Sequence, residues 1–359
     1  MASSRQTTRL PAPSLNWLLL FIPVSIAAEL LGQTVAVFIT SALAIVPLAG
    51  LIGRSTEQVA VRLGPRTGGL LNATLGNITE PIVAVFLIRA GDFPIVKASL
   101  VGSILGNLLL VLGIALTIGG VGHKEQRFSS RAAGVHSASL LLAVAGLVMP
   151  ALLIITTPAV GFFEREVVSG VVAIVLITLY LAALVFTQIT HAHLFHAPDR
   201  TEKAKWSLRW SVVVLAGSAG FVGVESELLV SSLSPAIHAL QLPPLFVGLI
   251  IIPIIGNAAE HASAVFFAAK DRVDVTLEIA VGSSTQIAMF VAPLLVFISL
   301  AIGHPMDFVF SAFEIAVVSL ATLIVTVISL DGRSNWLAGV QLAGAYVVIA
   351  ATAFFVSVA

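Results

Sequence analysis

Gly76-Asn77-Ile78-Thr79-Glu80 recurs 180 residues later as Gly256-Asn257-Ala258-Ala259-Glu260, and each pentapeptide lies inside a long apolar stretch. At the same offset, without gaps, Val101-Gly102-Ser103 aligns with Val281-Gly282-Ser283. Chance coincidence explains matches among Ala, Val and Phe, but it does not readily explain matching polar residues at a fixed spacing. The sequence therefore predicts an internal repeat.

The composition places this repeat in a membrane. The chain has 359 residues, of which 58% are hydrophobic and 10% are charged, whereas an average globular chain has about 25% charged residues. So few charges would not cover the surface of a soluble protein. The 18 Lys and Arg residues balance 18 Asp and Glu residues, which argues against a nucleic-acid-binding protein. Cysteine is absent, which excludes disulfides, thiolate metal sites and a Cys nucleophile.

An all-α polytopic membrane protein is the predicted fold class. A membrane helix needs about 20 mostly apolar residues, and windows of that length indicate eleven spans. They cover residues 14–32, 35–61, 68–88, 95–119, 133–156, 167–189, 210–234, 243–268, 275–301, 308–330 and 336–357.

The repeat divides these spans into one extra helix and two sets of five. We expect residues 1–33 to be a tail plus the extra helix, 34–190 the first repeat, 191–208 a cytoplasmic linker and 209–359 the second repeat. Because five is odd, the second copy enters the membrane from the opposite side. Inverted repeats of this kind are typical of secondary transporters, which bind substrate near the bilayer midplane between the halves.

Lys and Arg indicate the orientation. With the N-terminus in the cytoplasm, alternation of the spans places fifteen of the 18 Lys and Arg residues inside and only Arg89, Lys97 and Arg165 outside. Cytoplasmic loops carry such an excess. We therefore expect a multi-pass membrane protein with a cytoplasmic N-terminus and an external C-terminus.

Two carboxylates inside the membrane are the main candidates for function. Glu80 and Glu260 lie in otherwise apolar spans, where a carboxylate costs at least about 2.5 kcal/mol. Asn77 and Asn257 precede them by three residues and so share a helix face with them. The inverted repeat would bring both faces to the centre. Carboxylate, amide and backbone oxygens suit a hard divalent cation, Ca²⁺ above all.

Other residues at related positions are further candidates. Gly76 and Gly256 open the two motifs and are expected to loosen the helices and free carbonyl groups. Ser103 and Ser283 are candidates to complete the ligand set, as are Asn107 and Gln286, although all four would serve equally well as interhelical hydrogen-bonding groups. The same choice applies to His261, either a proton relay or a neutral histidine bonded to a neighbouring helix.

One span before each motif, Ser55-Thr56-Glu57 corresponds to Glu225-Ser226-Glu227 through a ten-residue gap. The histidines His191, His193 and His196 resemble a metal cluster by their spacing. Because they lie in a surface loop and no shell of carboxylates accompanies them, a metal site there is the weaker interpretation, and sensing of cytoplasmic pH is the alternative.

The two motifs resemble the signatures of the Ca²⁺/H⁺ antiporter family within the cation/Ca²⁺ exchanger superfamily. The second reads Gly-Asn-Ala-Ala-Glu-His-Ala-Ser-Ala from Gly256, and the first runs from Gly69 to Glu80. Further similar stretches are Leu43–Ala49, Gly102–Gly113, Ser226–Val230 and Ser283–Ala288. The chain departs from the family in having Pro81 after Glu80, and its linker is rich in His and Lys where some relatives have an acidic segment.

This resemblance implies Ca²⁺ export or sequestration driven by protons, with Glu80 and Glu260 as carboxylates shared by Ca²⁺ and H⁺. It also implies a prokaryotic plasma membrane as the location. It also implies that Asn77 and Asn257 are ligands or helix-break partners. Glu57 and Glu227 would line the ion path, in which we include the neighbouring Glu225. Ca²⁺ and H⁺ are then substrates, the lipid bilayer is the surroundings, and no cofactor or nucleic acid is expected. Whether copies of the chain associate is left open.

Three other functions compete with this one. A Na⁺/Ca²⁺ exchanger of the same superfamily is the nearest alternative, but its sites generally use more hydroxyl and acidic ligands. A passive Ca²⁺ channel shares the ligand chemistry without the coupling. An intramembrane hydrolase would need a nucleophile or paired aspartates within the membrane, and the spans contain neither HExxH nor GxGD. The chain is therefore not expected to be an enzyme.

Overall fold

The computed structural model describes residues 15–123, 125–192 and 204–356, and nearly all of them are helical. Residues 15–192 contain the elements η1 (Leu15–Leu20), α1 (Phe21–Leu30), α2 (Thr34–Leu63), α3 (Pro65–Leu75), α4 (Thr79–Ala90), α5 (Phe93–Leu105), η2 (Gly106–Val111), α6 (Leu112–Val121), α7 (Ser130–Thr156), α8 (Phe162–Val185) and η3 (Phe186–Thr190).

Residues 204–356 contain the elements α9 (Leu208–Leu240), α10 (Pro244–Phe246), η5 (Val247–Ile251), α11 (Ile252–Gly256), α12 (Ala258–Ala268), α13 (Val273–Leu277), η6 (Glu278–Gly282), α14 (Ser283–Gln286), η7 (Ile287–Val291), α15 (Ala292–Ala301), α16 (Ala312–Ser329) and α17 (Trp336–Phe355). The short strands β1 (Gln126–Arg127) and β2 (Arg333–Ser334) pair antiparallel. They join two connections that are far apart in the sequence.

Eight helices of the described chain are long and apolar enough to cross a membrane, and a bent pair, Pro244–Gly256 with Ala258–Ala268, raises this number to nine. The predicted membrane fold is thus confirmed in its helical, multi-pass character. The first predicted span corresponds to a shorter apolar helix, Leu15–Leu30. The range 68–88 is divided between α3 and α4.

The predicted span 308–330 begins four residues too early. Its helix starts at Ala312 because Ser311 and Glu314 form a capping box, in which each side chain accepts a hydrogen bond from the other residue's backbone N–H. Just before it, Asp307 forms an ion pair with Lys97 on α5. Polar contacts therefore hold residues 302–311 outside the helix.

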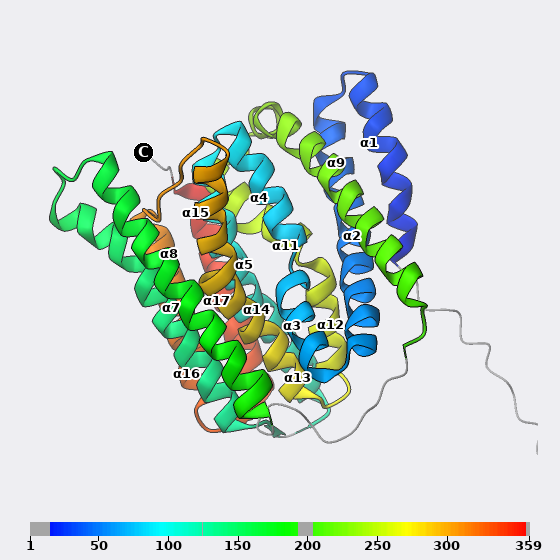
Figure 1. Cartoon of the computed structure of the whole chain (residues 1–359), viewed down its shortest axis with the longest axis vertical. Helices are drawn as coiled ribbons and strands as arrows, with labels where there is room; N and C mark the ends of the chain where they lie inside the picture. Colours follow the sequence, from blue (N-terminus) through cyan, green and yellow to red (C-terminus); the bar gives the residue numbers. More distant parts are fainter. Residues whose placement is uncertain (1–14, 124, 193–203, 357–359) are drawn as a thin grey trace, which may run out of the picture.

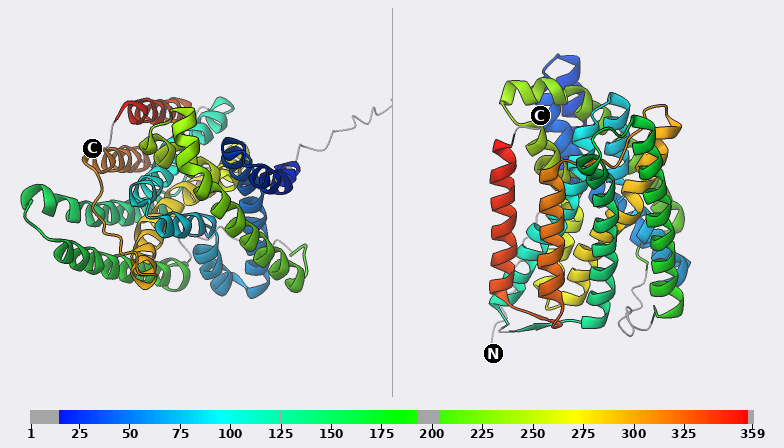
Figure 2. Two further views of the ribbon diagram at one scale, coloured as in Figure 1. Left: turned by 90° about the horizontal axis from the view of Figure 1, so that it is seen from above. Right: turned by 90° about the vertical axis from the view of Figure 1, so that its left-hand side faces the viewer.

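The helices form a bundle with two recognisable sides (Figure 1). α1, α2 and α9 lie along one side, and α7 and α8 lie along the other, as the view from above also shows (Figure 2). The broken helices α3–α4 and α10–α12 lie between them, together with α5. α2 packs along α9 over much of their length, and α1 packs against both.

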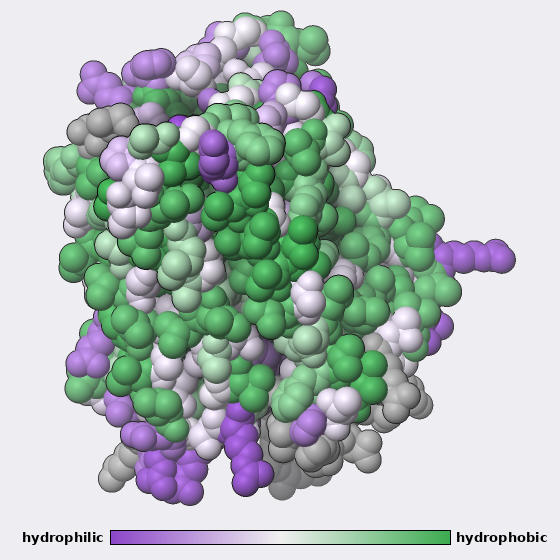
Figure 3. Space-filling view, turned by 60° about the vertical axis from the view of Figure 1, so that its left-hand side comes forward, coloured by the Kyte–Doolittle hydropathy of each residue, from purple (hydrophilic) through white to green (hydrophobic). Residues whose placement is uncertain are grey.

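The connections between helices gather at two opposite ends. The β1–β2 ribbon and the α12–α13 turn lie at the lower end in Figure 1, whereas the α7–α8 and α15–α16 connections lie at the upper end. Basic residues of the lower end include Arg127, Lys270, Arg272 and Arg333. In the space-filling view, apolar residues cover the middle of one face and hydrophilic residues gather mainly toward its two ends (Figure 3).

Two separate apolar cores hold the bundle together. The larger core includes buried residues of α5, α6, α7, α15 and α16. It also includes buried residues within 38–45 of α2 and 229–237 of α9. The smaller consists of Leu48, Ile52 and Val222, with partly buried residues of η1, α1 and α4 around them. The part of the α2–α9 pair that is predicted to lie nearer the cytoplasm therefore packs in a separate core.

Candidate cation site

The two Gly-Asn motifs form the breaks in the two interrupted helices. The first break separates α3 from α4, and a tight turn crosses it through the hydrogen bond from Glu80 N to the Asn77 carbonyl, 3.3 Å. At the second break, α11 and α12 meet at an angle of 64°. Asn257 lies at this bend, and its side-chain Nδ2 donates to the Pro253 carbonyl at 3.1 Å. Each break thus brings its Asn and Glu into the interior.

Glu80 joins the two repeats through hydrogen bonds. Its Oε1 accepts hydrogen bonds from the Ser103 hydroxyl on α5 and from Asn257 Nδ2, the latter at 2.6 Å. Asn257 Nδ2 also lies 3.1 Å from Ser103 Oγ. The three side chains come from three elements in both halves of the chain, so their contact depends on correct packing of the whole centre.

Glu260 has the equivalent serine as its neighbour. The Ser283 hydroxyl, at the start of α14, hydrogen-bonds to the Glu260 carboxylate, and Glu80 is close enough for its charge to act on Glu260. The pairs Glu80–Ser103 and Glu260–Ser283 occupy matching positions in the two sequence motifs, 180 residues apart. Two carboxylates and two hydroxyls therefore converge near the middle of the bundle.

Several atoms at this centre have no hydrogen-bonding partner. Glu80 Oε2, Glu260 Oε2 and Asn77 Nδ2 are buried and unpartnered in the described chain. A cavity next to Glu80 is lined by Glu80, Ser103, Pro253 and Gly256 among others. Buried oxygens without donors are costly, and a cation between the two carboxylates would satisfy them.

The ligand chemistry fits a hard cation and little else. Within the described ranges, no three His, Cys, Asp or Glu side chains come close enough together to hold a metal ion. A cation here would therefore need hydroxyl, amide or carbonyl oxygens besides Glu80 and Glu260. Ca²⁺ takes about six to eight such oxygens in flexible geometry.

Asn107, His261 and Gln286 are three further predicted site residues with buried polar atoms. Asn107 is fully buried in the π-helical segment η2, and neither atom of its side-chain amide has a partner in the described chain. His261 Nε2 and Gln286 Nε2 are also buried and unpartnered. The His261 ring lies against Gly106, where a Cβ would come within 3.9 Å of it. None of the hydrogen bonds described for Glu80 involves these residues.

The three predicted pathway carboxylates differ in their surroundings. Glu57 on α2 and Glu227 on α9 are exposed, whereas Glu225 is fully buried. Glu225 Oε1 accepts a hydrogen bond from the Ser25 hydroxyl of α1 at 2.9 Å. His191 stacks on Phe186 with ring centroids 4.0 Å apart, and His193 and His196 lie outside the described residues.

The sequence analysis missed two residues with polar roles. The Pro253 carbonyl accepts from Asn257, and Ser25 is the partner of Glu225. A signal for the second contact was present, because Ser25 and Glu225 are polar residues within two apolar spans. What the sequence did not contain was the packing of α1 against α9.

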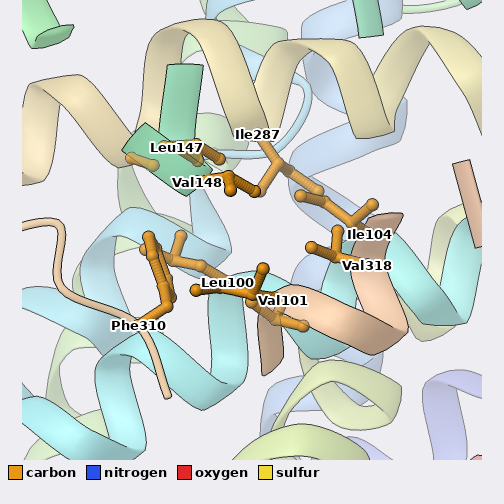
Figure 4. A pocket seen from close by; sticks show the side chains of 10 residues that line it. Leu100, Val101, Ile104, Leu147, Val148, Ile287, Phe310 and Val318 are labelled. Carbon is orange, nitrogen blue, oxygen red and sulfur yellow. The ribbon is translucent and has the colours of Figure 1, made fainter. Parts of the chain in front are cut away.

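A second cavity lies on the other side of α5, and its lining is entirely apolar (Figure 4). Leu100 borders both cavities. In Figure 4, Leu147, Val148 and Ile287 face Leu100 and Phe310 across the space. Because no polar side chain reaches this cavity, it is not a cation site.

The chain is similar to known exchangers over nearly its whole length. The family model described as "Sodium/calcium exchanger protein" matches residues 33–188 and 210–355. A protein named Ca²⁺/H⁺ antiporter from Synechocystis is 46% identical, with 94% of this chain and 96% of that protein covered. The Ca²⁺/H⁺ antiporter ChaA of Bacillus subtilis is 39% identical over 92% of this chain and 95% of its own. The solved structure of native YfkE superposes with a TM-score of 0.84 at 36% identity, covering 95% and 100% of the two chains.

Proposed function

Since the chain belongs to the sodium/calcium exchanger protein family, we propose that it is a secondary transporter that exchanges Ca²⁺ for H⁺ by alternating access. The observation that carries this proposal is the pair of buried carboxylates, Glu80 and Glu260, each with an unpartnered oxygen at a shared centre. Relatives named Ca²⁺/H⁺ antiporters, at 39–46% identity, favour H⁺ over Na⁺ as the coupling ion.

Coupling follows from competition for the same oxygens. A bound Ca²⁺ requires both carboxylates in their ionised form, whereas protons neutralise them. Ca²⁺ and protons therefore exclude one another, and a carrier that moves only when loaded with one or the other exchanges them. The empty site, with two bare charges, would cross the membrane slowly because that state is costly. Charge balance gives about two protons per Ca²⁺ through Glu80 and Glu260.

The fold supports eleven spans arranged as one helix plus two inverted repeats. The two ranges of the family model, 33–188 and 210–355, nearly coincide with the predicted repeats 34–190 and 209–359. The π-helical segments η2 (106–111) and η7 (287–291) also lie one repeat apart. On this arrangement, Asn77 and Asn257, with Gly76 and Gly256, occupy equivalent places around the cation.

The orientation follows from the basic residues at the two ends. The lower end in Figure 1, rich in Lys and Arg, would face the cytoplasm. Because the chain has no native Cys, a single Cys at Arg333 can be labelled specifically. If an impermeant reagent added outside intact cells labelled this Cys, the lower end would face the outside, and the proposed orientation would be wrong.

The test is proton-driven Ca²⁺ uptake by purified protein in vesicles. An imposed pH gradient should drive Ca²⁺ against its own gradient, and a Na⁺ gradient alone should not. Glu80→Gln and Glu260→Gln should each abolish the uptake, because an amide neither ionises nor exchanges a proton. Glu314→Gln is the matched control: Glu314 is also buried on a membrane helix, but it caps α16.

Three results would contradict the proposal. Uptake driven by Na⁺ alone would identify the alternative exchanger, and Ca²⁺ flux that only follows its own gradient would identify a channel. Near wild-type uptake by either Gln variant would mean that its carboxylate is not shared by Ca²⁺ and H⁺.

A further inference from the structure

Glu225 is a buried carboxyl group that the exchange mechanism does not use. Glu225 lies on α9 and Ser25 lies on α1, and both residues have 0% of their surface exposed. Ser25 Oγ donates to Glu225 Oε1 at 2.9 Å and lies 2.8 Å from the Ile22 carbonyl. Glu225 Oε2 is buried and has no partner in the described chain. The contact therefore connects α1 to α9 in the membrane interior.

The helices around Glu225 supply no counter-charge to it. The ionisable residues on α1, α2, α4 and α9 are Glu29, Arg54, Glu57, Arg62, Glu80, Arg89, Arg209, Glu227 and His238. Arg54 bonds to Asn16 Oδ1 and the Gly50 carbonyl, and Arg62 bonds to the Trp206 carbonyl. In the described ranges, Ser25 is the one hydrogen-bonding partner of Glu225, and no ion pair reaches it.

A charge in this position would be poorly compensated. One hydroxyl does not replace the hydration of an ionised carboxylate, and burial of an unpaired charge is normally avoided by neutralisation. A protonated carboxyl keeps an acceptor oxygen for the Ser25 hydroxyl and carries no charge. The surroundings of Glu225 thus suit the neutral acid.

The position also breaks the symmetry of the repeats. The residue that corresponds to Glu225 in the first repeat is Ser55, whose hydroxyl bonds back to the carbonyls of Leu51 and Ile52 in its own helix. Ser25 belongs to α1, which lies outside both repeats. A carboxyl group that has no equivalent in the other repeat is not part of the paired Glu80 and Glu260 arrangement.

We propose that Glu225 is a proton-binding site separate from the exchange site, protonated in this conformation, where it holds α1 against α9. The consequence for transport rests on the proposed exchange function, and on movement of α9 during the exchange cycle. Loss of the Glu225 proton would then leave an uncompensated charge between α1 and α9, which favours opening of this contact to water. The exchange rate would change as a result, independently of Ca²⁺ binding at Glu80 and Glu260.

The site can be tested without transport, by infrared spectroscopy of the purified full chain. Saturating Ca²⁺ keeps Glu80 and Glu260 ionised, so a remaining carbonyl band of a protonated carboxylic acid reports carboxyl groups elsewhere. We expect this band at neutral pH in the wild type and its loss in Glu225→Gln. Ser25→Ala should retain the band at a shifted frequency, because the carbonyl loses its hydrogen bond. Glu314→Gln should leave the band in place.

The outcomes separate this inference from the exchange function. An identical spectrum of the wild type and Glu225→Gln would overturn it, whether or not the protein transports Ca²⁺. In vesicles, we expect the exchange rate of the wild type to fall at alkaline pH as Glu225 loses its proton. Glu225→Gln should show a smaller fall, because the amide stays neutral at every pH. An unchanged pH profile would overturn the role in transport, whereas failure of the wild type to exchange would overturn the proposed function and leave the infrared result valid.

Discussion

At the residue scale, one asparagine connects the two halves of the candidate site. Asn257 donates to Glu80 and to the Pro253 carbonyl and contacts Ser103, whereas the equivalent Asn77 has a side-chain nitrogen without a partner in the described chain. The repeats are thus equivalent in sequence but not in contacts. Such asymmetry is expected of a carrier in a single conformation, since the two repeats exchange roles when access alternates.

This asymmetry predicts different effects of two equivalent substitutions on stability. Asn257→Ala should lower the thermal stability of the Ca²⁺-free, detergent-solubilised protein, because the Pro253 carbonyl and Glu80 Oε1 lose a buried donor, at a cost of about 1–3 kcal/mol. Asn77→Ala removes an amide nitrogen that has no partner, so its loss of stability should be smaller. Thermal unfolding of both variants beside the wild type measures the difference. Equal losses would show that the contacts of Asn257 do not stabilise this conformation.

At the scale of the elements, the site depends on a close crossing between α5 and the segment η5–α11. A Cβ at Gly102 would lie 2.0 Å from the Leu249 carbonyl oxygen and 2.6 Å from Pro253 Cγ. The backbone at Gly102 therefore touches the neighbouring helix directly. This approach places Ser103, the next residue, within reach of Glu80 and Asn257.

Gly102→Ala should consequently disrupt the crossing. Overpacking of a tight contact costs about 1–3 kcal/mol or more, so we expect a lower folded yield and a lower thermal stability. Gly282→Ala is the matched control, because Gly282 is the repeat equivalent of Gly102 and a Cβ there meets nothing within 4 Å. Size-exclusion profiles and thermal unfolding compare the two. Equal destabilisation by both substitutions would refute the steric explanation.

The elements also show what the sequence was able to predict. The apolar windows predicted where most helices lie, because that signal is local. The paired motifs predicted that Glu80, Glu260, Ser103 and Ser283 lie near one centre, because that signal is repeated. The i,i+3 argument placed each Asn beside the Glu of its own motif. Asn257 instead bonds to Glu80, because it lies at a bend and faces the other repeat. Such contacts depend on how helices cross, which spacing along one helix does not specify.

A similar limit applies to Asn107, a candidate ligand that lies four residues after Ser103 in the sequence. A π-helical segment begins at Gly106, and it changes the rotation per residue from that of an α-helix. Ser103 bonds to Glu80, whereas Asn107 has no partner in the described chain. The sequence pattern gave no indication of this change in helix type.

At the scale of the whole molecule, α1, α2 and α9 form a unit that lies beside the interrupted helices. α2 and α9 pack together, and Leu48, Ile52 and Val222 form a small core between them. Partly buried residues of α1 and of the start of α4 pack against this core. At the lower end, Gln58 and Arg62 of α2 bind the backbone of Lys205 and Trp206, just before α9 begins. Because α2 packs on α9 more extensively than on any interrupted helix, we expect α1, α2 and α9 to move as one body past α12, over the small core that they share with α4.

A disulfide between the two bodies tests this movement. A Cβ at Gly50 on α2 would lie 3.8 Å from the Cβ of Ala259 on α12, and the Cβ atoms of disulfides are on average about 3.8 Å apart. Gly50→Cys combined with Ala259→Cys should therefore form a bond on oxidation, in a chain that has no other Cys. We expect the bond to stop exchange, because α2 can no longer move past α12, and a reductant to restore it. The reduced double variant and the two oxidised single variants are the controls, since they carry the same side chains without the bond. Full exchange by the completely crosslinked protein would mean that α2 and α12 move together, and the boundary between the moving parts would then lie elsewhere.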